Sequence, residues 1–319
     1  MITFNVDGYE FIVDDIYPRK ITMADSYLIS SNKIGTGNGE AKLYLGSKFK
    51  TRAYFGGEGF CVECFLLKND LIQFLDYIES QYKNPIIKHR ADRKKLRELW
   101  SERRKKINEL NEIIPFTIFD KCNLKGDRGY VKSKDVAFKI IREISLPLVS
   151  YLSIMRVIEV QTNKHKYYWK LFVDYDYLDS IVDATVFKYG KRKNKEKRKR
   201  PGQAKYRSLL LEECPSCPIT HISNKDLLIA SHIKPFADSS KKEKIDPKNG
   251  FILSLIYDKL FGLGYITFSD EKKMLVSKWL PSEDQDLLKL NEIDYVKDLP
   301  LDEERKKYLE YHRKNVFMH

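Results

Sequence analysis

The segment 226–265 constrains the fold of this chain more than any other stretch of the sequence. An apolar run ends at His232, a polar loop leads to Asn249-Gly250, and a second apolar run continues through Asp258. Short apolar runs bounded by turn residues are typical of buried strands, and a longer run can continue as a helix. We therefore expect a strand, a loop, a second strand and a helix, with Asp258 in the first turn of that helix.

This order of elements brings an imidazole and a carboxylate onto one compact unit. Phosphodiester hydrolysis needs a water to lose a proton, and it needs the charge on the phosphate to be neutralised. His232 suits the first task because the unperturbed pKa of histidine is about 6.5. Asp258 suits the second, since carboxylate oxygens bind hard cations such as Mg²⁺. Asn249 could bond back across the loop and orient the histidine or the metal.

Each of these residues also has an ordinary structural interpretation. His232 could be a strand-end histidine bonded to the backbone, and Asp258 could be a carboxylate that caps its helix. Asn249 and the following glycine form a common turn pair. Lys234 could contact a phosphate, or it could be exposed beside Pro235. The residue types alone leave these alternatives open.

The surrounding motifs favour the chemical interpretation. In chain order they are Arg200-Pro-Gly-Gln-Ala-Lys-Tyr-Arg207, Cys217-Pro-Ile-Thr220, Ala230-Ser-His-Ile-Lys-Pro-Phe236, Asn249-Gly250, Tyr257-Asp-Lys-Leu-Phe261 and Tyr311-His-Arg-Lys-Asn-Val-Phe317. Residues 198–319 thereby resemble the HNH endonuclease family, in its restriction-endonuclease-like subgroup. The resemblance implies an α+β protein with a C-terminal ββα-metal nuclease domain that cuts double-stranded DNA. It also implies that His232 and Asn249 are catalytic and that Asp258 binds Mg²⁺ or Mn²⁺.

Two residues depart from the pattern of that family. Gly262 replaces the acid that usually follows Leu-Phe, so the metal would rest more heavily on Asp258. His221 replaces a glycine and has no family role to inherit. The alternative function is therefore a DNA-binding protein that reads sequence or base modification and carries a degenerate HNH unit. An RNA-directed nuclease is a third interpretation, which the resemblance does not favour.

The positive charge of the chain favours a polyanionic partner. Lysine and arginine number 58 against 45 acids, a net charge of +13. Cations placed at phosphates release condensed counterions, so such a surplus favours DNA binding. Much of it lies in 90–114, expected to be an amphipathic helix, and in 188–200, although both could be solvated surface. We expect DNA contacts from Arg97, Arg103, Arg104, Lys191, Arg192, Arg198, Arg200 and Lys234.

The change in composition at 188–200 predicts the domain organisation. We expect a DNA-recognition region at 1–187, which could divide further into a strand-rich segment at 1–85 and a helical segment at 86–187. The run 188–200 would be a basic linker, because long runs of like charge are normally solvated. The nuclease domain would follow at 201–319. Specificity is assigned to the first region because the chemistry of a ββα-metal unit is aimed at the DNA backbone.

Five cysteines in no dense framework indicate reduced thiols and a cytoplasmic protein. Cys214 and Cys217 have the spacing of half a structural Zn²⁺ site, but the other two ligands are not local. The most apolar stretch, 144–160, is interrupted by a proline and an arginine, so no membrane partner is expected. A homodimer is expected because cutting both strands of a palindrome needs two active sites.

Overall fold

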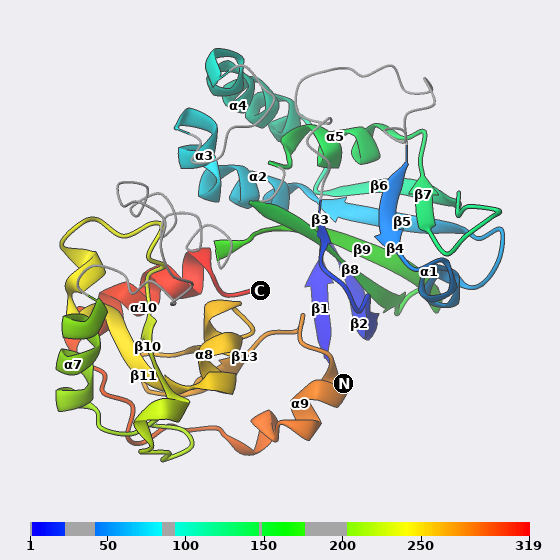
Figure 1. Cartoon of the computed structure of the whole chain (residues 1–319). Coiled ribbons are helices and arrows are strands. Elements are labelled where there is room, and N and C mark those ends of the chain that lie inside the picture. The colour runs from blue at the N-terminus through cyan, green and yellow to red at the C-terminus, as the bar shows by residue number, and fades with distance from the viewer. Residues whose placement is uncertain (1, 23–41, 85–92, 147–148, 176–202) are drawn as a thin grey trace. The chain divides into compact units, whose positions relative to one another are not determined.

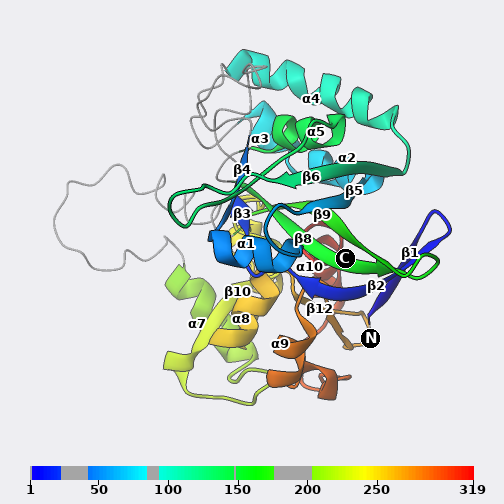
Figure 2. The same cartoon turned by 90° about the vertical axis from the view of Figure 1, so that its right-hand side faces the viewer.

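The computed structural model describes residues 2–22, 42–84, 93–146, 149–175 and 203–319 (Figures 1 and 2). The chain divides into two compact units, Met1–Asp174 and Tyr175–His319. The basic run 188–200, expected to be a linker, lies outside the described residues. Each unit has its own core and is described by itself.

The first unit is built on a mixed sheet with nine strands among the described residues. Its strands are β1 (Thr3–Val6), β2 (Tyr9–Ile16), β3 (Ile21–Thr22), β4 (Leu43–Gly46), β5 (Cys61–Leu67), β6 (Ile113–Asp120), β7 (Gly129–Lys132), β8 (Ser150–Glu159) and β9 (Lys164–Val173). They lie in the order β1-β2-β8-β9-β5-β6-β7-β4, and β3 also pairs with β8. The β5–β9 pair is parallel and the other neighbours are antiparallel.

Helices accompany this sheet. They are α1 (Lys48–Phe55), α2 (Lys68–Tyr77), α3 (Glu79–Lys83), α4 (Arg93–Asn108) and α5 (Val136–Ile144). Figures 1 and 2 both show α2, α3, α4 and α5 grouped on one side of the sheet. Aromatic side chains fill much of the core, with Trp169 and Tyr168 almost completely buried on β9.

Two expectations for this unit are corrected. The helix expected over 90–114 ends at Asn108, because Ile113 and Ile114 belong to β6 and pair with Leu67 and Leu66 of β5. The described residues of the expected helical segment 86–187 do not form a separate helical unit, since they supply β6, β7, β8 and β9 to the same sheet as the first strands. Pro115 sits inside β6 where β7 does not pair with it, a position that tolerates a missing N–H.

The first helix described in the second unit is α7 (Gln203–Glu213). The unit continues with η2 (Lys225–Leu227), β10 (Leu228–His232), η3 (Glu243–Ile245), η4 (Pro247–Asn249), β11 (Gly250–Ser254), α8 (Leu255–Gly262), β12 (Ile266–Phe268), β13 (Met274–Val276), α9 (Ser282–Leu287), η5 (Leu290–Glu292) and α10 (Glu303–Asn315). β10 pairs with β11, and β12 with β13, both antiparallel. The expected α+β class is confirmed. No helix of the described residues is long and apolar enough to cross a bilayer.

Candidate active site

The expected strand, loop, strand and helix are present as β10, the loop 233–249, β11 and α8. His232 is the last residue of β10 and pairs in register with Gly250, the first residue of β11. Asp258 is half-buried in the first turn of α8, and α8 contacts both strands. Every residue of β11 is buried, in keeping with the apolar side chains of Phe251, Ile252 and Leu253 at its centre. The local fold therefore gathers the three expected site residues on one small unit.

Among the described residues, Tyr206, Phe236 and Lys244 contact the imidazole of His232. Its ring stacks on the ring of Tyr206 with centroids 4.4 Å apart and planes inclined by 14°. The ring of Phe236 meets it edge-on at 5.6 Å. Its Nε2 lies 3.1 Å from the carbonyl oxygen of Lys244. A carbonyl only accepts hydrogen bonds, so Nε2 carries the proton and the lone pair of the neutral ring lies on Nδ1.

The side chain of Asn249 is fully buried and bonds to the loop 233–249. Its Oδ1 accepts from the backbone nitrogen of Lys234 at 2.8 Å. Its Nδ2 donates to the carbonyl oxygens of Lys234 and Glu243 and to the hydroxyl of Ser239. These bonds fix the loop whose Lys244 carbonyl meets His232. In the structure the side chain of Asn249 therefore holds the loop 233–249, and its expected catalytic role stays a prediction.

Lys234, one of the expected DNA contacts, is paired within the same loop. Its Nζ lies 2.9 Å from Oε1 of Glu243, and it lies over the ring of Tyr311 at 5.1 Å. Partial burial opposes ionisation of Glu243, but hydrogen bonds from the Ser240 backbone and from Lys234 lower the pKa of its carboxyl group. The charge of Lys234 is therefore engaged by an ionised acid in the described structure.

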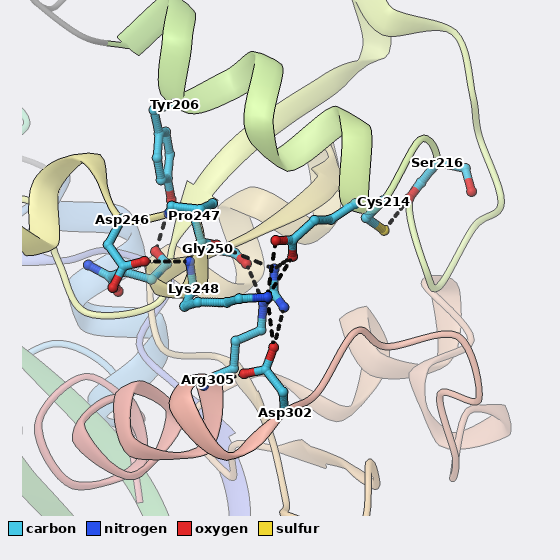
Figure 3. A network of polar contacts seen from close by, with 11 residues as sticks. Tyr206, Cys214, Ser216, Asp246, Pro247, Lys248, Gly250, Asp302 and Arg305 are labelled. Carbon is cyan, nitrogen blue, oxygen red and sulfur yellow. Dashed lines mark hydrogen bonds and ion pairs between the residues drawn. The ribbon is translucent and has the colours of Figure 1, made fainter.

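Side chains on one face of α10 bond to the loop 233–249. Tyr308 donates its hydroxyl to Asp246 at 2.8 Å, and Tyr311 donates to Asp238 at 2.9 Å. Arg305, one helical turn earlier, also contacts this region through its guanidinium (Figure 3). Residues three apart share a face of a helix, which explains why these side chains reach one loop. The C-terminal motif that contains Tyr311 thus helps to support the site.

Asp258 would need further oxygen ligands to bind a hard metal ion. Gly262 lies one turn further along α8 and supplies no side chain. Within the described stretches of the chain, no three His, Cys, Asp or Glu residues lie together as a metal-binding group. Mg²⁺ commonly keeps several waters and uses one or two carboxylates together with phosphate oxygens of the substrate. The donor set at Asp258 is consistent with that mode of binding.

The two cysteines of the expected zinc half-site lie in the hydrophobic core of the second unit. Cys214 and Cys217 are both buried free thiols within the hydrophobic core of the second unit. Cys214 donates its thiol to the carbonyl oxygen of Ser216 at 3.1 Å, and burial raises the pKa of this thiol. His221, the nearest extra candidate in sequence, is exposed and lies 3.7 Å from Asp298. Among the described residues, no complete zinc-binding group is found.

The arginines of α4 have different surroundings. Arg103 is 7% exposed and donates to the hydroxyl of Tyr82 at 3.0 Å, which corrects the expectation that it contacts DNA. It occupies the same helical stripe as the buried Leu96 and Ile107, a signal that the sequence already contained. Arg104 pairs with Asp76 at 2.8 Å. Arg97 is exposed, whereas Lys191, Arg192, Arg198 and Arg200 lie outside the described residues.

Sequence reasoning missed the groups that hold the His232 ring. Tyr206 belongs to a motif quoted above, but a motif does not show which residue a side chain contacts. Phe236 also lies in a quoted motif. The carbonyl of Lys244 has no sequence signature, because every residue has one. These contacts appear only when α7 and the loop 233–249 are folded against β10.

The structure places a histidine at the end of one strand and a carboxylate on the helix packed against the hairpin, which is the expected ββα arrangement. Residues 217–269 match the family model described as HNH endonuclease. This segment of the chain is thus an HNH endonuclease domain, and the expected resemblance is confirmed for it. HNH nucleases generally use divalent metal ions, and their domain implies a DNA substrate. The comparison with curated proteins gives no match.

Proposed function

We propose that this protein is a metal-dependent endonuclease of restriction or defence type that hydrolyses double-stranded DNA. The observation that carries the proposal is the orientation of His232. Its Nε2 is committed to the Lys244 carbonyl, which directs basicity to Nδ1. This tautomer leaves Nδ1 able to accept a proton, as a general base must.

The residues divide the work as follows. His232 takes a proton from the attacking water at Nδ1, and the Lys244 carbonyl holds the Nε2 proton as the ring becomes positive. Asp258 would hold the cation, Mg²⁺ or Mn²⁺. When bound, that cation would neutralise charge on the phosphate and stabilise the leaving oxygen. Asn249 keeps the loop, and therefore the Lys244 carbonyl, in place.

Replacing His232 tests this proposal. The variant His232→Ala should lose at least about 100-fold in the rate of plasmid cleavage with Mg²⁺, because general base catalysis contributes on the order of 10²–10⁴. DNA binding, followed by fluorescence anisotropy, should change little. His221→Ala removes an exposed histidine of the same domain and is the matched control. Cleavage by His232→Ala at the parent rate would show that the assignment is wrong.

A DNA-binding protein with a degenerate HNH unit is the second candidate. The specific observation in its favour is Gly262, which leaves α8 with one carboxylate at the site. The two candidates separate when pure protein is incubated with unmodified and modified genomic DNAs and Mg²⁺. Tight binding without strand breaks on any of them supports the second candidate.

Recognition is assigned to residues 1–187, with Arg97, Arg104 and the run 188–200 contributing phosphate contacts. This assignment is supported by the distribution of charge in the sequence. Two nuclease domains would be needed to cut both strands of a palindrome, so the proposal includes a homodimer. Sedimentation with and without DNA measures the oligomeric state, and sequencing of fragment ends identifies the recognition site.

A further inference from the structure

The ring that stacks on His232 belongs to a tyrosine that is itself buried and hydrogen-bonded. Tyr206 lies on α7 and is 1% exposed. Its ring is nearly parallel to the imidazole, at 14° and 4.4 Å between centroids. Among the described ring contacts of His232, Phe236 meets the imidazole edge-on and Tyr206 stacks flat against it. The orientation of His232 therefore depends on where this tyrosine sits.

The hydroxyl of Tyr206 fixes that position against β11. It donates to the carbonyl oxygen of Asn249 at 2.9 Å in a buried hydrogen bond (Figure 3). A Cβ added to Gly250 would lie 2.0 Å from the same hydroxyl oxygen, which is far inside contact distance. Gly250 therefore has no side chain for a steric reason, and Tyr206 occupies the space beside it. Since Gly250 pairs with His232, one tyrosine contacts both members of this register pair.

We propose that Tyr206 is a positioning residue for His232, with its aromatic face setting the plane of the imidazole and its hydroxyl setting the position of that face. The proposal rests on the proposed role of His232 as general base. It extends that role to α7, which lies before the matched segment 217–269. A misplacement of about 1 Å in a catalytic group can lower a rate by about 100-fold.

Substitutions of Tyr206 test the role of its aromatic ring and the role of its hydroxyl separately. Tyr206→Leu removes the aromatic face and should lower kcat by about 100-fold with KM for DNA changed less than about twofold. Tyr206→Phe keeps the face and should lose about tenfold or less, since one neutral hydrogen bond contributes about 0.5–1.5 kcal/mol. Tyr206→Met fills most of the volume without an aromatic face, and it serves if the leucine variant does not fold.

Two further measurements distinguish positioning from stability. Phe268→Leu is the matched control, because Phe268 is fully buried in the same core but is not a contact of His232. A loss of kcat no larger in Tyr206→Leu than in Phe268→Leu of equal stability would overturn the proposal. The NOEs between the ring protons of His232 and Phe236, measured by NMR without DNA, should weaken in Tyr206→Leu and Tyr206→Met but much less in Tyr206→Phe. Unchanged NOEs would also overturn the proposal.

The outcomes also separate this inference from the proposed function. If the parent protein cuts no DNA, the endonuclease assignment fails and the NOEs between His232 and Phe236 alone decide whether Tyr206 orients His232. If the parent cuts DNA and His232→Ala does not, parent-like kcat in both Tyr206→Leu and Tyr206→Met would contradict the inference and leave the endonuclease assignment standing.

Discussion

The guanidinium of Arg305 donates from Nε to the carbonyl oxygen of Gly250 at 3.3 Å, and so ties α10 to the residue paired with His232. Arg305 is 2% exposed and also forms ion pairs with Glu213 of α7 and with Asp302, the N-cap of α10. Lys248 bridges the same two acids (Figure 3). Burial opposes ionisation of Glu213 and Asp302, but hydrogen bonds from the two cations or the nearby backbone lower the pKa of both carboxyl groups.

Removing the charge of Arg305 should destabilise the second unit. Arg305→Met leaves two acids facing one lysine and should lower the free energy of unfolding by about 2–4 kcal/mol, less than a fully buried pair because the acids are partly exposed. Urea denaturation measures the change. Lys314→Met, which removes an exposed ion pair with Glu310 on the same helix, should have little effect. Equal losses in the two variants would contradict the importance of the buried network.

His312 should make stability depend on pH. It is fully buried, and burial lowers its pKa from 6.5 to about 3. Its Nε2 donates to the Phe261 carbonyl and its Nδ1 accepts from Thr267, so the neutral ring is satisfied. The unfolded state binds a proton below about pH 6.5 that the folded state rejects, so stability falls by about 1.4 kcal/mol per pH unit from there toward pH 4.

The variant His312→Gln cannot take up that proton. Its stability should be lower at pH 7, because the stack of His312 on Phe261 is lost, but its slope between pH 6 and pH 4 should be flatter. His221→Gln, at an exposed site, should keep the parent slope. Chemical denaturation at several pH values measures both. A parent-like slope in His312→Gln would assign the pH dependence to other groups.

The side-chain amide of Asn249 should be needed to hold the loop 233–249 in place. Asn249→Ala leaves the Lys234 backbone nitrogen and nearby carbonyls without their partner, which should cost about 2–3 kcal/mol of stability. Asn249→Asp should not restore it, because an ionised carboxylate cannot donate to the Lys234 and Glu243 carbonyls. Thermal unfolding and the cleavage rate measure the two effects. Parent-like values for Asn249→Asp would show that Nδ2 is unimportant.

The Mg²⁺ concentration needed for cleavage should depend on the number of carboxylates that α8 supplies. Asp258→Asn should raise the Mg²⁺ concentration for half-maximal cleavage by about tenfold or more, since Mg²⁺ prefers charged oxygen ligands. Gly262→Asp places a second carboxylate four residues later on the same face and should lower that concentration. Asp270→Asn, at an exposed acid, is the control. If Asp258→Asn and Asp270→Asn behave alike, Asp258 is not the metal ligand.

The salt dependence of DNA binding should identify the phosphate contacts. Replacing Lys191, Arg192, Arg198 and Arg200 with serine should flatten the slope of log affinity against log salt by about 0.9 for each true contact. Arg103→Met should leave the slope unchanged and lower stability instead, because Arg103 is buried against Tyr82. Anisotropy titrations at several salt concentrations give both slopes. A slope change in Arg103→Met would contradict its structural role.

The sequence alone determined the elements that depend on local pattern. The apolar runs on either side of the loop 233–249 predicted β10, β11 and α8, and the structure contains all three. Asp302 suits the start of the last helix as a capping residue, and its side chain accepts from the Arg305 backbone as an N-cap. Such features could be predicted because neighbouring residues suffice to form them.

The tertiary structure decided everything that depends on distant partners. Ile113 and Ile114 fit a helical stripe as well as a strand, and only pairing with β5 selects the strand. The sequence allows Arg103 to contact a phosphate or to lie in the core, and only the structure shows its guanidinium bonded to the hydroxyl of Tyr82. The orientation of His232 is set by Tyr206 and the Lys244 carbonyl, neither of which is its neighbour in sequence. Local periodicity specifies which face of an element is apolar, but the group that meets that face is chosen only when the whole chain folds.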